Sequence, residues 1–217
     1  MMGSEDPPNK PVSVPKRRLR AVFAADVANF SGQVSVSETR GFMNLSSVLR
    51  VGRDELDRYE GVLISTPGDG LFALFESAVS AVNCALAIQD RLGHQSEAGA
   101  MPLRIGIHLG EVLFDGDAPF GETLNIAARL EGLADPGGIL VSGAVVDATA
   151  ARVSATFESR GVPRLKNIPR RIGTFSVKPA SCPPSQAVDV ADEDQLDHTM
   201  RFSRRRSPTV SIDELNE

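Results

Sequence analysis

The order in which apolar runs and helical patterns alternate along this chain limits its possible folds more than any other feature. Short apolar runs predict buried strands, and apolar residues that recur with a helical period predict helices. The segments alternate as strand, helix, strand, strand, helix and strand, at residues 19–25, 38–59, 62–64, 71–75, 77–93 and 103–113. This β-α-β-β-α-β order predicts an α+β fold of the ferredoxin-like type.

Residues that favour turns and helix ends lie between these segments. Gly61 is expected to end the first helix, and Ser77 is placed to cap the second. The run Pro67-Gly68-Asp69-Gly70 separates two short apolar runs and therefore predicts a β-hairpin. Further elements are predicted beyond this core, as a helix at 122–133, a strand at 139–142, a short helix at 143–150 and strands at 154–160 and 172–178.

Composition indicates one folded body with a tail at each end. The chain has 217 residues, and the apolar patterning lies within residues 18–178. Residues 1–17 and 179–217 are rich in Pro, Ser and charged residues, so we expect both tails to be disordered. A formal net charge of −5 argues against a nucleic-acid partner. Neither a membrane-spanning run nor a signal-peptide pattern is visible, which favours a cytoplasmic protein with no membrane partner.

Two aspartates occupy positions where their carboxylates can converge. Asp26 ends the first apolar strand, and Asp69 lies in the predicted hairpin turn. In a β-α-β-β unit the first strand lies beside that turn, so both carboxylates can approach one site. Two such carboxylates can hold two divalent metal ions, which can drive attack of a hydroxyl on a phosphate. Taken singly, each aspartate also has a structural explanation, as a strand-end residue or as a turn residue.

A polar pair on a later helix completes this candidate site. Asn125 and Arg129 are four residues apart, so they share one face of the predicted helix. The arginine offers a planar fork for phosphate oxygens, and the asparagine can both donate and accept hydrogen bonds. The alternative is an ordinary surface pair on an amphipathic helix.

Six ordered stretches of this sequence resemble the class III nucleotidyl cyclase family, the catalytic domain of adenylate and guanylate cyclases. They are Phe23–Ser31, Thr66–Leu71, Arg104–Val112, Phe120–Glu131, Ala134–Ile139 and Leu165–Ile168. Together they cover the predicted body, 18–178. The resemblance implies a cyclase core with extra C-terminal strands and helices, two divalent metal ions (Mn²⁺ or Mg²⁺) and a nucleoside triphosphate substrate.

The resemblance also implies roles for the residues near the first strand and the hairpin. Asp26 and Asp69 match the two metal-binding aspartates of the family. Val27 matches the residue that lends a backbone carbonyl to one metal. Phe30 and Ser31 fall in the phosphate-binding turn that follows the strand.

The second half of the site is implied in the same way. Asn125 and Arg129 match the pair that orients the ribose and stabilises the transition state, and Lys166 falls where the family places a lysine on the terminal phosphates. In the family the aspartates come from one subunit and the Asn/Arg pair from the other. A single cyclase domain therefore implies a homodimer with shared active sites.

Two departures from the family pattern concern the base of the substrate. Adenylate cyclases usually carry a lysine four residues before the second metal aspartate, where this chain has Ser65, and an Asp or Thr seven residues before the asparagine, where it has Ala118. Guanylate cyclases use other polar residues there. A buried base edge needs a partner for each donor and acceptor, and neither residue supplies the usual purine reader.

These departures leave three hypotheses about function. The favoured one is a stand-alone pyrimidine cyclase that makes cyclic UMP or cyclic CMP as a second messenger in antiphage defence. The first alternative is an adenylate cyclase that makes cyclic AMP with atypical base recognition. The second alternative is an inactive nucleotide-binding module, which the intact metal and transition-state residues disfavour.

Overall fold

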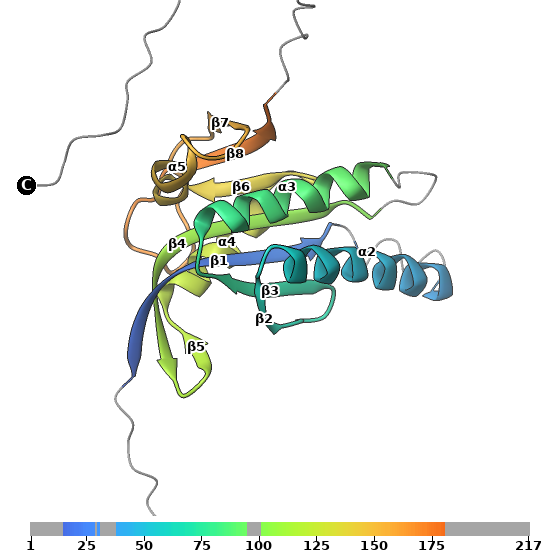
Figure 1. Cartoon of the computed structure of the whole chain (residues 1–217), viewed down its shortest axis with the longest axis horizontal. Coiled ribbons are helices and arrows are strands. Elements are labelled where there is room, and N and C mark those ends of the chain that lie inside the picture. Colours follow the sequence, from blue (N-terminus) through green and yellow to red (C-terminus); the bar gives the residue numbers. More distant parts are fainter. Residues whose placement is uncertain (1–14, 29, 31–37, 95–100, 181–217) are drawn as a thin grey trace, which may run out of the picture. The chain divides into compact units, whose positions relative to one another are not determined.

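The computed structural model describes residues 15–28, 30, 38–94 and 101–180 of the chain. Its first four strands confirm the predicted ferredoxin-like unit (Figure 1). They are β1 (Lys16–Val27), β2 (Val62–Ser65), β3 (Gly70–Phe75) and β4 (Leu103–Asp115). Their order in the sheet is β2-β3-β1-β4, and every neighbouring pair among them is antiparallel. β1 extends beyond the predicted strand and includes Lys16 and Arg17, which the sequence placed in the N-terminal tail.

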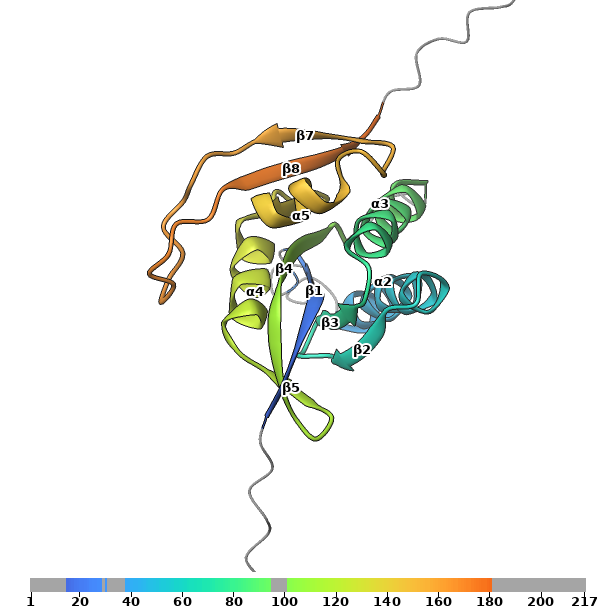
Figure 2. The same cartoon turned by 60° about the vertical axis from the view of Figure 1, so that its left-hand side comes forward.

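Two long helices pack on one face of this sheet, α2 (Glu38–Arg58) and α3 (Ala78–His94) (Figure 2). Their apolar faces bury Phe23 and Phe75, whose ring centroids lie 5.9 Å apart. The backbone N–H of Ser80 donates a hydrogen bond to Ser77 Oγ at 3.3 Å, so Ser77 caps α3 as predicted. Among the described residues, no helix combines the length and the apolar character needed to cross a bilayer.

The second half of the body extends the sheet and covers its other face. Its elements are β5 (Ala118–Phe120), α4 (Glu122–Leu133), β6 (Ile139–Ser142), α5 (Gly143–Thr149), β7 (Ala155–Ser159) and β8 (Thr174–Pro179). β6 lies parallel to β4, and β8 and β7 continue the sheet beyond it. The sequence did not predict β5, because three residues that include Pro119 are too short for a periodic signal.

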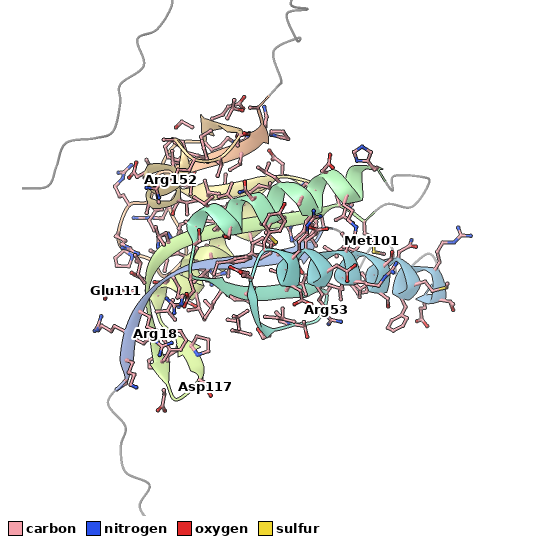
Figure 3. All side chains as sticks on the ribbon, viewed as in Figure 1. Arg18, Arg53, Met101, Glu111, Asp117 and Arg152 are labelled. Carbon is pink, nitrogen blue, oxygen red and sulfur yellow. The ribbon has the colours of Figure 1, made fainter. Side chains whose placement is uncertain are left out.

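β5 forms a hairpin with the end of β4 through a turn at Gly116, where φ is +60°. This hairpin and the start of β1, marked by Asp117 and Arg18 in Figure 3, lie at the same end of the sheet. The guanidinium of Arg18 lies 5.4 Å from the centre of the Phe114 ring, which joins the two segments by a cation–π contact.

Two glycines of β4 allow α4 to lie directly on the sheet. A Cβ added at Gly106 would overlap the backbone of Ala127 and Glu131, and it would lie 2.8 Å from Glu131 Cα. A Cβ at Gly110 would lie 2.9 Å from Thr123 Oγ1. The first half of β4 is therefore covered on both faces, and the backbone of α4 lies in direct contact with it.

The segment between β7 and β8, residues 160–173, covers the outer side of α4. Three of its residues join the core around α4, namely Leu165, Ile168 and Ile172. Arg170 pairs with Glu122 at 3.2 Å and also lies 3.2 Å from Nε2 of the buried His108. Because a guanidinium only donates, this contact requires an unprotonated Nε2, and the Nδ1–H of His108 then donates to Ser142 Oγ at 2.8 Å.

Protonation of His108 should weaken the fold. Burial and the adjacent Arg170 lower the pKa of His108 to about 4. In the unfolded chain a histidine binds its proton below about pH 6.5. Neutral His108 therefore contributes fully to the free energy of unfolding above that pH, and this contribution is lost as the pH falls towards 4. As the pH drops from 6.5 to 4, we expect the free energy of unfolding to fall less for His108→Gln than for the wild type. Urea unfolding of both proteins across this range measures the difference, and parallel curves would contradict the prediction.

Candidate active site

The first half of the site lies at the end of β1. Asp26 pairs with Gly70 in the β1–β3 ladder, so the preceding residue, Asp69, lies beside it. The 3.0 Å hydrogen bond from the Gly70 N–H to the Pro67 carbonyl closes the turn that carries Asp69. Burial raises the pKa of the Asp26 carboxyl, and the neighbouring Asp69 raises it further. The structure therefore brings together the two aspartates that the sequence predicted as a pair.

Two residues with no predicted role complete this charged cluster. Arg104 lies opposite Asp26 in the β1–β4 ladder, and its NH2 atom lies 3.0 Å from Asp26 Oδ2. Its Nε atom lies 3.3 Å from Oε1 of Glu131, near the end of α4. Burial, with Asp26 and Asp69 nearby, raises the pKa of Glu131 to about 7. Both residues lie in family-like stretches of the sequence, but only strand register and helix packing show that they meet.

The chemistry of this cluster fits divalent cations. Asp69 disfavours the ionised form of Asp26, and a cation between the two carboxylates would remove that repulsion. Within the described part of the chain, no three His, Cys, Asp or Glu side chains form a metal cluster. Mg²⁺ is commonly held by one or two carboxylates, with water and substrate phosphates as the other ligands. Two aspartates are therefore a sufficient protein contribution, with the Val27 carbonyl at the end of β1 as the predicted additional ligand.

The second half of the site lies on α4 and on the segment that covers it. Asn125 and Arg129 are exposed on α4, four residues apart. Arg129 lines a hollow of about 280 Å³ together with Arg164 and Lys166. Arg164 was not predicted, and it adds a third basic side chain to this hollow. The arrangement can bind an anionic group such as a polyphosphate.

The two halves face different sides of α4. Glu131 points towards Arg104 and the Asp26 carboxylate. Arg129 precedes it by two residues, which is a rotation of about 200° on an α-helix. Arg129 is accordingly exposed and lies on the side of α4 away from Asp26. One copy of the chain thus presents the predicted site residues as two groups, on opposite sides of one helix, and we call these groups the candidate half-sites.

Three of the remaining predicted residues have a described position, namely Phe30, Ser65 and Ala118. Phe30 is half-buried and packs against the main core, whereas Ser31 lies outside the described residues. Ser65 is exposed at the end of β2, next to an irregularity in its pairing with β3. Ala118 is exposed at the start of β5. Neither of the last two positions presents a charged or amide group to a base.

A larger hollow, of about 550 Å³, lies between the end of α3, the turn after α4 and β8. None of the predicted site residues lines it. Its basic side chains Arg160 and Lys178 are paired with Asp135 and Glu158, at 2.9 and 2.8 Å. The carboxylates with raised pKa values lie near the end of β1 and not here. We therefore do not assign the reactive site to this hollow, although it is the larger of the two.

Comparisons with known proteins agree with this geometry. Residues 21–179 match the family model described as the adenylate and guanylate cyclase catalytic domain. The chain is 32% identical to the "Putative adenylate cyclase 3" of Rhizobium meliloti, over 80% of this chain and 31% of that protein. It therefore spans about a third of the length of this curated relative.

Two solved structures share the fold. An adenylate/guanylate cyclase/hydrolase from Silicibacter pomeroyi has a TM-score of 0.70 and 34% identity, with 76% of this chain and 99% of that chain covered. The adenylyl cyclase CyaB from P. aeruginosa has a TM-score of 0.67 at 21% identity, over 76% of this chain and 96% of that chain. The chain belongs to the adenylate and guanylate cyclase catalytic domain family, that is, to the class III nucleotidyl cyclases.

Proposed function

We propose that two copies of this chain form a homodimer that converts a nucleoside triphosphate into a 3′,5′-cyclic nucleotide and pyrophosphate. The observation that carries the proposal is the placement of the two half-sites on opposite sides of α4. Since Arg129 lies away from the Asp26 carboxylate of its own chain, a second copy has to supply the complementary half. A twofold arrangement then creates two equivalent sites.

In each site, Asp26, Asp69 and the Val27 carbonyl would hold two divalent metal ions, Mn²⁺ or Mg²⁺. These ions supply neutralising charge and lower the pKa of the ribose 3′-hydroxyl. Asn125 from the second copy orients the ribose, so that the 3′-oxygen faces the α-phosphate. The new P–O bond forms at this oxygen, the bond to the β-phosphate breaks, and the hydroxyl proton passes to solvent.

Basic side chains and backbone groups stabilise the negative charge on the phosphates during this reaction. Arg129 stabilises the negative charge that grows on the α-phosphate, an electrostatic effect worth about 3 kcal/mol for one such donor. We expect the segment that contains Phe30 and Ser31 to receive the phosphates. Lys166 and Arg104 bind the terminal phosphates and the leaving pyrophosphate. In this structure the Arg104 guanidinium is paired with Asp26, and it would be available to phosphate once that carboxylate held a cation.

The proposed substrate is a pyrimidine triphosphate, UTP or CTP. This proposal is supported by the side chains at positions 65 and 118, where a cyclase that recognises a purine base is expected to carry charged or amide groups. This chain has Ser65 and Ala118 there instead. The product, cyclic UMP or cyclic CMP, would act as a second messenger in antiphage defence. The names of the relatives favour the alternative substrate ATP, with backbone groups as readers of the base.

The purified protein, incubated with Mn²⁺ and each of ATP, GTP, CTP and UTP, tests these proposals. We expect cyclic UMP or cyclic CMP as the main product, identified by its mass. Predominant cyclic AMP would support the alternative substrate. Nucleotide binding without any cyclic product would contradict an active enzyme and would indicate a binding module.

Mixing two inactive variants tests whether the sites are shared. We expect Asp26→Ala and Arg129→Ala to be inactive alone and to regain activity when they are refolded together. Random pairing gives half heterodimers with one intact site each, so about a quarter of wild-type activity should return. Mixing Asp26→Ala with Asp69→Ala is the matched control, because both lesions lie in the same half-site and no intact site can form. Equal activity in the two mixtures would contradict the shared-site dimer.

A further inference from the structure

We propose that Glu131 is a positioning residue that holds the Nε side of Arg104, so that the other side of the guanidinium can exchange Asp26 for substrate phosphate. The inference rests on the proposed function, because it requires a triphosphate beside Asp26. It gives a role in substrate binding to a residue that does not itself touch the substrate.

The position of Glu131 is fixed by the backbone. The main chain of α4 at Glu131 lies against Gly106, where no Cβ can be accommodated. Arg104 precedes Gly106 by two residues in β4, so its side chain emerges on the same face of the strand as α4. Glu131 and Arg104 therefore face each other because of main-chain packing, and not through a flexible surface contact.

The contact between these two side chains is incomplete. Arg104 Nε and Glu131 Oε1 lie 3.3 Å apart, but both are buried and neither has an aligned hydrogen-bond partner. A buried charged group without a hydrogen bond is costly. Such a pair needs an explanation, and a second arrangement that satisfies both atoms provides one. In the present arrangement the Arg104 NH2 atom is bound to Asp26, which holds the guanidinium out of line with Glu131.

The charges around Arg104 show what would change. Asp26 and Glu131 both contact this one guanidinium, and Asp69 lies near both of these carboxylates. A divalent cation on the two aspartates would leave Glu131 as the remaining carboxylate partner of Arg104. The Nε atom can then bind Glu131, while the terminal nitrogens form the planar fork that suits phosphate oxygens.

Binding of a triphosphate that cannot react separates this role from catalysis. The probes are the 3′-deoxy forms of the four nucleoside triphosphates with Mg²⁺, and the dissociation constant is measured by calorimetry. We expect Glu131→Ala and Arg104→Ala each to weaken binding about tenfold, the scale of one charged hydrogen bond. The double variant should bind no more weakly than Arg104→Ala, because the two residues act as one unit. A double variant weakened about a hundredfold, the product of independent effects, would overturn the inference.

Two further variants exclude a purely structural role. Glu131→Gln keeps an oxygen that can accept from Arg104 Nε, so we expect binding within about threefold of the wild type. Its melting temperature without metal should be no lower, since the amide removes a charge that burial disfavours. Glu111→Ala removes an exposed carboxylate paired with Arg17 and is the matched control that leaves binding unchanged. A melting temperature of Glu131→Gln well below that of the wild type would instead indicate a structural role and overturn the inference.

The outcomes for Glu131 and for the proposed function can be told apart. Non-additive binding in a protein that cyclises no triphosphate supports the role of Glu131 and contradicts the enzyme. Additive binding in an active cyclase retains the enzyme and rejects the role of Glu131. A wild-type protein that binds none of the four triphosphates rejects both.

Discussion

Asp69→Asn should reduce cyclic-nucleotide formation by at least about a thousandfold, which corresponds to about 4 kcal/mol of transition-state stabilisation. The substitution keeps the size of the side chain and removes one of the two carboxylates of the proposed metal site. The remaining Asp26 would bind cations weakly, and it would not hold the two ions that two-metal chemistry needs. Initial rates with saturating Mn²⁺, for whichever triphosphate the wild type cyclises, measure the effect.

The same substitution should not weaken the fold, and this separates loss of chemistry from loss of structure. Asp69 raises the pKa of Asp26, so a neutral amide at position 69 removes a charge that opposes the ionised form of Asp26. We therefore expect Asp69→Asn to melt at or above the wild-type temperature when metal is absent. Asp90→Asn, at an exposed carboxylate on α3, is the matched control and should leave both activity and melting unchanged. Activity of Asp69→Asn within tenfold of the wild type would contradict the metal assignment.

The alternation of strands and helices was predictable because each long element carries its own periodic signal. The pairing of Asp26 with Asp69 followed from that order, since β1 must lie beside the β2–β3 turn in this topology. The match of residues 21–179 to the family model confirms the family that the motifs indicated. The assignment of individual residues to metal, ribose and phosphate stays a prediction.

Arg104 and Glu131 could not be predicted from local sequence. Arg104 meets Asp26 only because β1 and β4 pair in one particular register. Glu131 joins them only because Gly106 lets α4 approach β4 closely. The sequence does mark Asn125 and Arg129 as one helix face, but the orientation of that face away from Asp26 depends on how α4 packs. Contacts set by register and packing are therefore the part of the site that needed the structure.

This dependence on packing makes Gly106 the most sensitive backbone position of the site. We expect Gly106→Ala to destabilise the protein by at least about 3 kcal/mol, at the upper end of overpacking effects. The added Cβ would meet the main chain of Ala127 and Glu131, and main-chain atoms cannot move aside as a flexible side chain can. Either α4 moves away from β4, or the protein unfolds. Chemical denaturation gives the change in the free energy of unfolding.

Gly132→Ala is the matched control, because it lies on the same helix and a Cβ there meets nothing within 4 Å. Replacing a glycine by alanine inside a helix should stabilise the protein by about 0.5–1 kcal/mol. If some Gly106→Ala protein remains folded, its α4 is displaced, and Arg129 and Glu131, which lie on opposite sides of this helix, move with it. Folded Gly106→Ala should therefore lose triphosphate binding as well as turnover. Wild-type stability in Gly106→Ala would mean that α4 does not depend on this close approach, and the geometry assigned to both half-sites would then be wrong.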